Sequence, residues 1–143
     1  MTVHQISVFL ENRAGQLAEI TRVLADGGID MRAISIAETA DYGVLRLIVD
    51  KPQQATSTLL EHGFVLSMTP VTVVSVPDQP GGLAPVLQLV AEGETDIEYM
   101  YSLFTHTDGK AYMVFRVSDD DKFTALLASH GISPVTIQEL GIE

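Results

Sequence analysis

Two short loops of the chain carry the residue types best suited to hold a small polar ligand. Asn12–Leu17 (NRAGQL) and Asp78–Leu83 (DQPGGL) each follow a predicted strand and lead into a predicted helix. A glycine lets a ligand approach the backbone closely, and the helix start behind it offers unpaired N–H groups and a positive dipole to a carboxylate. The side-chain oxygen of Asn12 or Asp78 would accept hydrogen bonds from an ammonium group. Together these groups match the two charged ends of a free amino acid.

Structural roles compete with chemical ones at these and at other polar positions. Asn12 and Asp78 also fit turn stabilisation, a common use of both residue types. His62 and His130 each precede a glycine, where a cation at a helix C-terminus is favoured over a metal pair or a pH sensor. The run 119–121 (DDD) begins a predicted helix without the spacing of a calcium loop, which favours capping.

The composition indicates a folded, acidic protein. Of 143 residues, 8 are Lys or Arg and 19 are Asp or Glu, which gives a formal charge of −11 and disfavours nucleic-acid binding. The hydrophobic fraction of 46% suffices for a core, and the absence of cysteine excludes disulfides and thiol chemistry. The apolar runs are too short to span a membrane, and the N-terminus lacks the regions of a signal peptide, so a cytoplasmic protein is expected.

The chain repeats itself. A shift of 66 residues places Gly15 on Gly81, and later in each half a shift of 68 residues places His62-Gly63 on His130-Gly131. We therefore expect two units of about 70 residues, 1–69 and 70–143, joined by a short link at Ser67–Pro70.

Each half has the periodicity of strand, helix, strand, strand, helix, strand. The predicted strands are Ile6–Leu10, Met31–Thr39, Val44–Val49 and Phe64–Met68 in the first half, and Val71–Val76, Ile97–Thr105, Ala111–Val117 and Pro134–Glu139 in the second. The helices are predicted around Leu17–Leu24, Leu83–Val90 and Phe123–Leu127, and a further one opens at Asp50-Lys51-Pro52 and closes at His62-Gly63. This order predicts an α+β fold of two tandem ferredoxin-like units, each an antiparallel sheet with two helices on one face.

The loop DQPGGL, after the strand Thr72–Val76, resembles the opening motif of an ACT domain, and NRAGQL resembles it with Ala14 in place of the usual proline. The resemblance covers essentially the whole chain as two ACT units in tandem. It implies small-molecule sensing, most often of amino acids, and regulation of metabolic enzymes or transcription. It also implies that the sheets join side by side with the helices on one face.

The resemblance further implies two related half-sites, each formed where the loop of one unit meets the second strand of a neighbour. The first would use Asn12, Ala14, Gly15, Gln16 and Leu17, and the second Asp78, Pro80, Gly81, Gly82 and Leu83. The facing walls would be Ile34, Ser35 and Ile36, and Met100, Tyr101 and Ser102. The missing proline and the difference between Ser35 and Tyr101 predict that the two sites are not equivalent.

We therefore expect a regulatory protein that binds a free amino acid at the junction of its units or at a homodimer interface. A metabolic enzyme is the expected partner, whereas nucleic acid and membrane are not. No phosphate-binding loop, GxSxG or HExxH motif occurs, so no catalytic residue, metal or cofactor is expected. The alternatives are a regulatory subunit of a separate amino-acid biosynthetic enzyme, a small ferredoxin-like enzyme, and a structural oligomerisation module.

Overall fold

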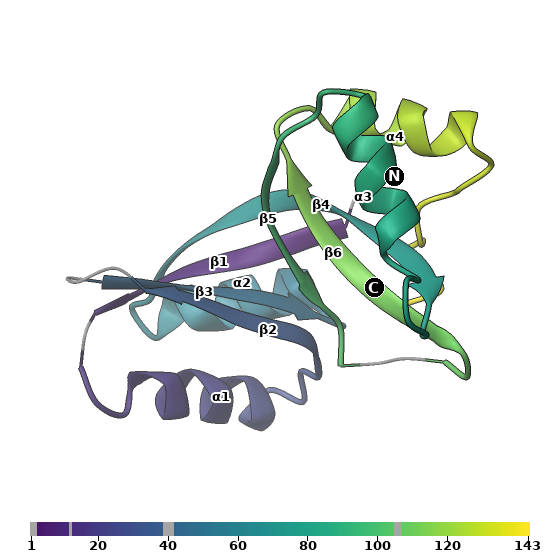
Figure 1. Ribbon diagram of the computed structural model, residues 1–143. Helices are drawn as coiled ribbons and strands as arrows, with labels where there is room; N and C mark the ends of the chain where they lie inside the picture. Colours follow the sequence, from purple (N-terminus) through teal and green to yellow (C-terminus); the bar gives the residue numbers. More distant parts are fainter. Residues whose placement is uncertain (1–2, 12, 39–41, 105–106) are drawn as a thin grey trace. The chain divides into compact units, whose positions relative to one another are not determined.

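The computed structural model describes residues 3–11, 13–38, 42–104 and 107–143 (Figure 1). In chain order the elements are β1 (Val3–Glu11), α1 (Gln16–Asp26), β2 (Met31–Glu38), β3 (Tyr42–Val49), α2 (Pro52–Glu61), β4 (Val65–Pro77), α3 (Ala84–Glu92), β5 (Ile97–Ser102), β6 (Lys110–Val117) and α4 (Asp120–Ser129). Within these ranges, no helix combines the length and the apolar character needed to cross a membrane.

The chain divides into two compact units. The N-unit consists of His4–Thr69 together with Gln138–Glu143, and the C-unit consists of Pro70–Ile137 together with Val3. The link predicted at Ser67–Pro70 lies inside β4, which supplies its first residues to the N-unit and its remaining residues to the C-unit. Each unit is described separately below.

The N-unit has the strand order β2-β3-β1-β4, in which β3 pairs antiparallel with both β1 and β2. Both helices cover the same face of these strands, where Ile20, Leu24 and Leu59 pack against Ile6 and Leu45. This order and the one-sided helices confirm the ferredoxin-like arrangement predicted for the first half.

Local sequence explains why α1 and α2 begin where they do. The chain enters α1 through Gly15, whose φ of 84° lies in the left-handed region that glycine adopts without strain. Ile20, Val23 and Leu24 then recur at helical spacing on the buried side of α1. Pro52 occupies the start of α2, where its missing N–H would have no partner.

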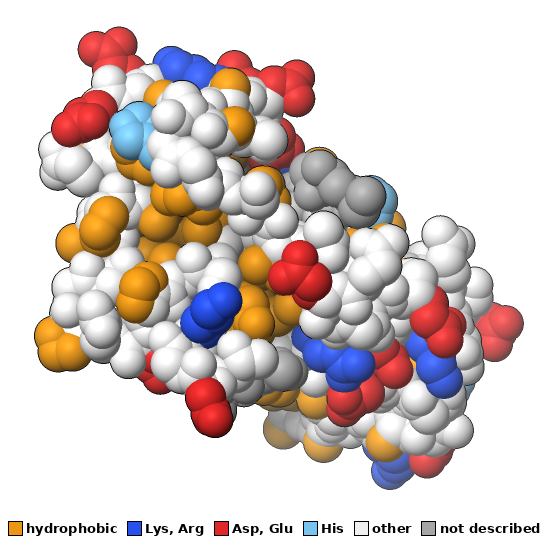
Figure 2. Space-filling model, turned by 90° about the vertical axis from the view of Figure 1, so that its right-hand side faces the viewer, with side chains coloured by type: hydrophobic (Ala, Val, Ile, Leu, Met, Phe, Trp, Pro, Cys, Tyr) orange, Lys and Arg blue, Asp and Glu red, His pale blue; other side chains and the backbone are white. Residues whose placement is uncertain are grey.

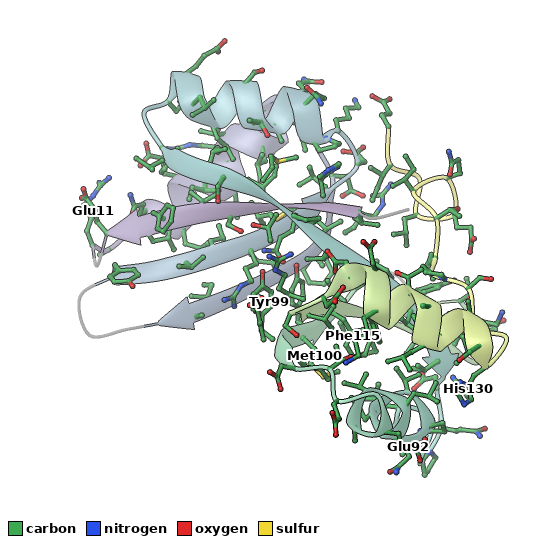
Figure 3. The ribbon with its side chains drawn as sticks, turned by 90° about the horizontal axis from the view of Figure 1, so that it is seen from above. Glu11, Glu92, Tyr99, Met100, Phe115 and His130 are labelled. Atoms are coloured by element: carbon green, nitrogen blue, oxygen red, sulfur yellow. The ribbon has the colours of Figure 1, made fainter. Side chains whose placement is uncertain are left out.

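The C-unit repeats this plan with the strand order β4-β6-β5 and antiparallel pairing on both sides of β6. Helices α3 and α4 pack through Val90, Phe123 and Leu127 onto one face of these strands. Phe115, labelled in Figure 3, lies on β6 with its ring centroid 5.3 Å from that of Phe123.

The predicted last strand, Pro134–Glu139, is not a strand in the structure. The backbone N–H of Val135 donates to the carbonyl of Val73 at 2.8 Å, so the segment starts beside β4 as a fourth strand would. Pro134 has no N–H to extend the pairing. Beyond Ile137 the chain belongs to the N-unit, where Arg32 Nε donates to the carbonyl of Leu140 at 2.9 Å.

Two adjacent leucines of α2 provide a test of this packing. Leu59 is completely buried in the N-unit core, whereas Leu60 is 54% exposed. We expect Leu59→Ala to lower the free energy of unfolding by about 2–5 kcal/mol, because it leaves a cavity, and Leu60→Ala to change it by less than about 0.5 kcal/mol. Denaturant titration of both variants measures the difference, and equal losses would contradict the orientation of α2.

Candidate functional site

In the N-unit, the loop between β1 and α1 is a tight turn that leaves the helix start open. The N–H of Arg13 donates to the carbonyl of Glu11 at 2.8 Å, and the carbonyl of Gly15 accepts the first helical bond from Glu19 at 3.0 Å. No side chain of the described residues caps α1. The predicted site residue Asn12 lies outside the described residues, while Ala14 and Gly15 are exposed.

Gln16, the first residue of α1, ties this helix to the end of β1. Its side-chain Oε1 accepts a hydrogen bond from the backbone N–H of Glu11 at 2.8 Å, and the residue is only 7% exposed. Because a backbone N–H can only donate, the oxygen of the amide must face it, which fixes the position of the amide nitrogen. Among the residues that the structure describes, no hydrogen bond from Nε2 is found.

A cavity of about 340 Å³ lies beside this amide, and we call it the N-cavity. Its lining combines one carboxylate and one amide with aromatic and aliphatic side chains: Phe9, Leu10, Glu11, Gln16, Tyr42, Gly63, Phe64 and Val65. These residues meet because β3 runs antiparallel to β1, which places Tyr42 opposite Glu11 at the end of the sheet. In Figure 3, Glu11 is labelled at this end of β1. Of the predicted residues, Gln16 lines the N-cavity, whereas Leu17 packs against the core.

The corresponding loop of the C-unit is built from backbone contacts. The N–H of Gly82 donates to the carbonyl of Gln79 at 3.0 Å, with Pro80 and Gly81 between them and Gly81 at a φ of 80°. Proline at the second position and glycine at the third are typical of a type II turn. The backbone N–H of Asp78 donates to the carbonyl of Gly109 at 2.9 Å, and its side chain does not cap α3.

A cavity of about 360 Å³, which we call the C-cavity, lies at the repeat-equivalent place in the C-unit. It is lined by Ser75, Val76, Pro77, Gly109, Lys110, Gly131 and Ile132. The shift of 66 residues relates its β4 residues to those of β1 in the N-cavity, and the shift of 68 relates Gly131 to Gly63 and Lys110 to Tyr42. The repeat in the sequence is therefore also a repeat of cavities.

The polar pair of the N-cavity has no counterpart in the C-cavity. Pro77 stands at the position of Glu11 and has neither an N–H nor a carboxylate, and Gly82 stands at the position of Gln16 and has no side-chain amide. A Cβ added to Gly82 would lie 1.9 Å from the carbonyl oxygen of Pro77, so no side chain fits there. The end of the strand and the loop touch through backbone alone in this unit.

The predicted walls do not line either cavity. Ile34, Ser35 and Ile36 lie on β2, which β3 separates from β1, and Met100, Tyr101 and Ser102 lie on β5, which β6 separates from β4. Strands are about 4.8 Å apart, so within its own unit each wall lies two strand spacings from the loop. Tyr101 instead stacks with Tyr99, with 6.4 Å between the ring centroids, and Met100 packs against the C-unit core.

Sequence reasoning missed most of the N-cavity lining, including Phe9, Tyr42, Phe64 and Val65. A usable signal was present in the element order. In a unit of this topology, the end of the first strand and the starts of the third and fourth strands share one edge of the sheet. Collecting the residues at these three points would have pointed to the cavity.

The histidines and the aspartate run have structural roles. The Nδ1–H of His62 donates to the carbonyl of Thr58 at 2.8 Å, and His130 Nδ1 lies 3.2 Å from the carbonyl of Leu126, so both serve helix ends. Asp119 Oδ1 caps α4 by accepting the N–H of Lys122 at 3.0 Å. Among the described residues, no group of three or more His, Asp or Glu is arranged to hold a metal, and Figure 2 shows carboxylates scattered over the visible face.

Asp120 is the one residue of this run in an unfavourable setting. Its Oδ1 is buried without a hydrogen-bond partner, and its Oδ2 lies 3.8 Å from Arg116 Nη1. Burial raises the pKa of Asp120 above its ordinary value of 3.8, although the Arg116 guanidinium opposes the shift.

Gly82→Ala tests the backbone packing of the C-unit loop. We expect it to lower the free energy of unfolding by about 1–3 kcal/mol, because the new methyl group would overlap the Pro77 carbonyl oxygen, which already accepts the N–H of Gln79 at 3.0 Å. Gly27→Ala is the control, since a Cβ there meets its nearest neighbour at an ordinary 3.4 Å. Chemical denaturation measures both variants, and a Gly82→Ala protein as stable as the control would show that the loop is built differently.

Asp120→Asn tests the raised pKa. A carboxyl that binds its proton more tightly in the folded state destabilises the fold when ionised, so we expect the Asn variant to be the more stable protein at pH 7. The difference should shrink as the pH falls and vanish below 3.8, where the Asp120 carboxyl is protonated in both states. Unfolding free energies from pH 3 to 7 measure this, with Asp121→Asn as the control for net charge. A less stable Asn variant at pH 7 would contradict the assignment.

Comparison with known proteins identifies the fold. A family model described as an ACT domain pair matches residues 1–141. Protein BT0572 from Bacteroides thetaiotaomicron is 38% identical, with a TM-score of 0.91 over 99% of this chain and 96% of that one. The regulatory subunits of aspartate kinase from Thermus thermophilus (20% identity, 90% of each chain, TM-score 0.65) and Thermus flavus (22% identity, 92% and 93%, TM-score 0.58) share the fold. No curated protein matches the chain. The chain belongs to the ACT domain pair family.

Proposed function

We propose that this protein is a non-catalytic sensor that binds a free amino acid and regulates a metabolic partner. The observation that carries the proposal is the open start of α1 beside the N-cavity, with the Gln16 side chain, fixed through its Oε1, in the cavity lining. Family membership supports it, because Gln16 of the first motif loop lines the N-cavity.

Electrostatics favours the same place for the ligand carboxylate. In a chain with a formal charge of −11, an anion needs a locally positive surface shielded from the other carboxylates. The first turn of α1 offers backbone N–H groups and the positive end of the helix dipole. Ala14 and Gly15 in front of it carry no bulky side chain that would block the approach.

The output of binding would be a change of arrangement or assembly. A ligand shifts such an equilibrium only by its difference in affinity for the two states. Chains of this fold include subunits that regulate aspartate kinase, which supports a separate enzyme as the partner here. A homodimer that completes the half-sites with residues of β2 or β5 is part of the same proposal.

Thermal unfolding in the presence of each of the twenty amino acids tests the function. An amino acid at 100 times its dissociation constant should add about 2.7 kcal/mol of stability. Because the two loops differ, Asn12→Ala and Asp78→Ala should weaken the effect unequally. If no amino acid raises the melting temperature, sensing is excluded as the function. If one does and neither variant responds, the motif loops are not the site.

A further inference from the structure

We propose that the N-cavity selects an amino acid with an apolar side chain, held by Gln16 and Glu11, and that the C-cavity does not bind one. This inference rests on the proposed function and specifies its ligand class and its site. It starts from the one nearly buried polar side chain that faces the N-cavity with unused donors, Gln16.

Gln16 is held ready to receive a carboxylate. The hydrogen bond from the Glu11 N–H to Oε1 fixes the amide plane, so Nε2 does not need to reorganise when a ligand binds. A ligand oxygen at the N-cavity would give Nε2 a hydrogen-bond partner. The position of Gln16 at the first residue of α1 adds the helix dipole to this attraction.

Glu11 lines the same cavity and would receive the ammonium group. The carboxylate and ammonium of an amino acid are separated by a single carbon, so they need partners that are close together. The backbone nitrogen of Glu11 is 2.8 Å from Gln16 Oε1, so the two residues are neighbours in the lining of the N-cavity, and the exposed Glu11 carboxylate would turn toward the ligand. Arg13 Nε lies 3.7 Å from the Glu11 carboxylate in an exposed pair, which a ligand ammonium would join or replace.

The remaining walls fit an apolar side chain. Phe9, Leu10, Phe64 and Val65 line the N-cavity, and Phe9 and Val65 are 47% and 65% exposed. A ligand that covered them would remove apolar surface from water. A charged ligand side chain would lose its hydration against these walls without gaining a partner, which disfavours acidic and basic amino acids.

The C-cavity serves as the internal comparison. It has a similar volume, yet proline and glycine stand where Glu11 and Gln16 stand in the N-unit. Its charged lining residue is Lys110, at the position of Tyr42. Lys110 can pair with a carboxylate, but the lining has no carboxylate to pair with an ammonium, so the two charged ends of an amino acid are not both matched.

Isothermal titration of the full-length chain tests the proposal. The probes are L-leucine, L-isoleucine, L-valine, L-methionine and L-phenylalanine, compared with L-aspartate, L-lysine and L-serine. We expect one of the apolar five to bind most tightly. Gln16→Met, which keeps the side-chain length but removes the amide, should weaken it tenfold to about a hundredfold. Val65→Trp, a change at an exposed strand residue, should weaken it at least tenfold by filling the cavity.

Ser133→Trp is the matched control, because residue 133 is the repeat equivalent of Val65 and is also exposed. It should leave the affinity within twofold of the wild-type value. If an apolar amino acid binds and both N-cavity variants keep its affinity, this site is wrong while the proposed function stands. Tighter binding of aspartate, lysine or serine would overturn the ligand class. Binding of none of these eight, together with no thermal stabilisation by any of the twenty amino acids, would overturn the proposed function itself.

Discussion

A single hydrogen bond, from the backbone N–H of Glu11 to the side chain of Gln16, organises the candidate site of the N-unit. It satisfies the last backbone donor of β1 with the first side chain of α1, and so links the end of the strand to the start of the helix. The same bond determines which atoms of the amide remain free. The contact that stabilises the turn from strand into helix thus also determines which polar group lines the N-cavity.

In the C-unit, the corresponding turn from strand into helix lacks this side-chain hydrogen bond. Pro77 removes the donor that would need a partner, and Gly82 lets the loop backbone press against the Pro77 carbonyl. Both solutions keep a glycine with positive φ before the helix, at Gly15 and Gly81. The two loops therefore have similar backbone conformations but different side chains at equivalent positions. This explains why one cavity of the repeat has the polar pair and the other lacks it.

Apolar periodicity predicted the element order, because spacing along the chain reports which face of a helix or strand is buried. It failed at Pro134–Glu139, where Val135 donates to the distant Val73 carbonyl but the chain then leaves β4 for the N-unit, in which Arg32 donates to the Leu140 carbonyl. Spacing along the chain does not report such long-range contacts. The candidate site could be predicted only in part, because sequence motifs report local residues and not those brought in from other elements. The motif led to Gln16, but Tyr42, Phe64 and Val65 come from other elements and reach the cavity only through strand pairing.

The C-terminal segment Gln138–Glu143 has a consequence for the order of events during synthesis. The C-unit has all of its residues once Ile137 has been made, whereas the N-unit, although translated first, still lacks six. Until these six residues have been made, Arg32 lacks its contact with the Leu140 carbonyl, and the Asp50 carbonyl lacks the N–H of Glu143. Domains generally fold in the order in which a ribosome releases them. Here the N-unit emerges first, but it can form its final contacts only after residues 138–143 have been made.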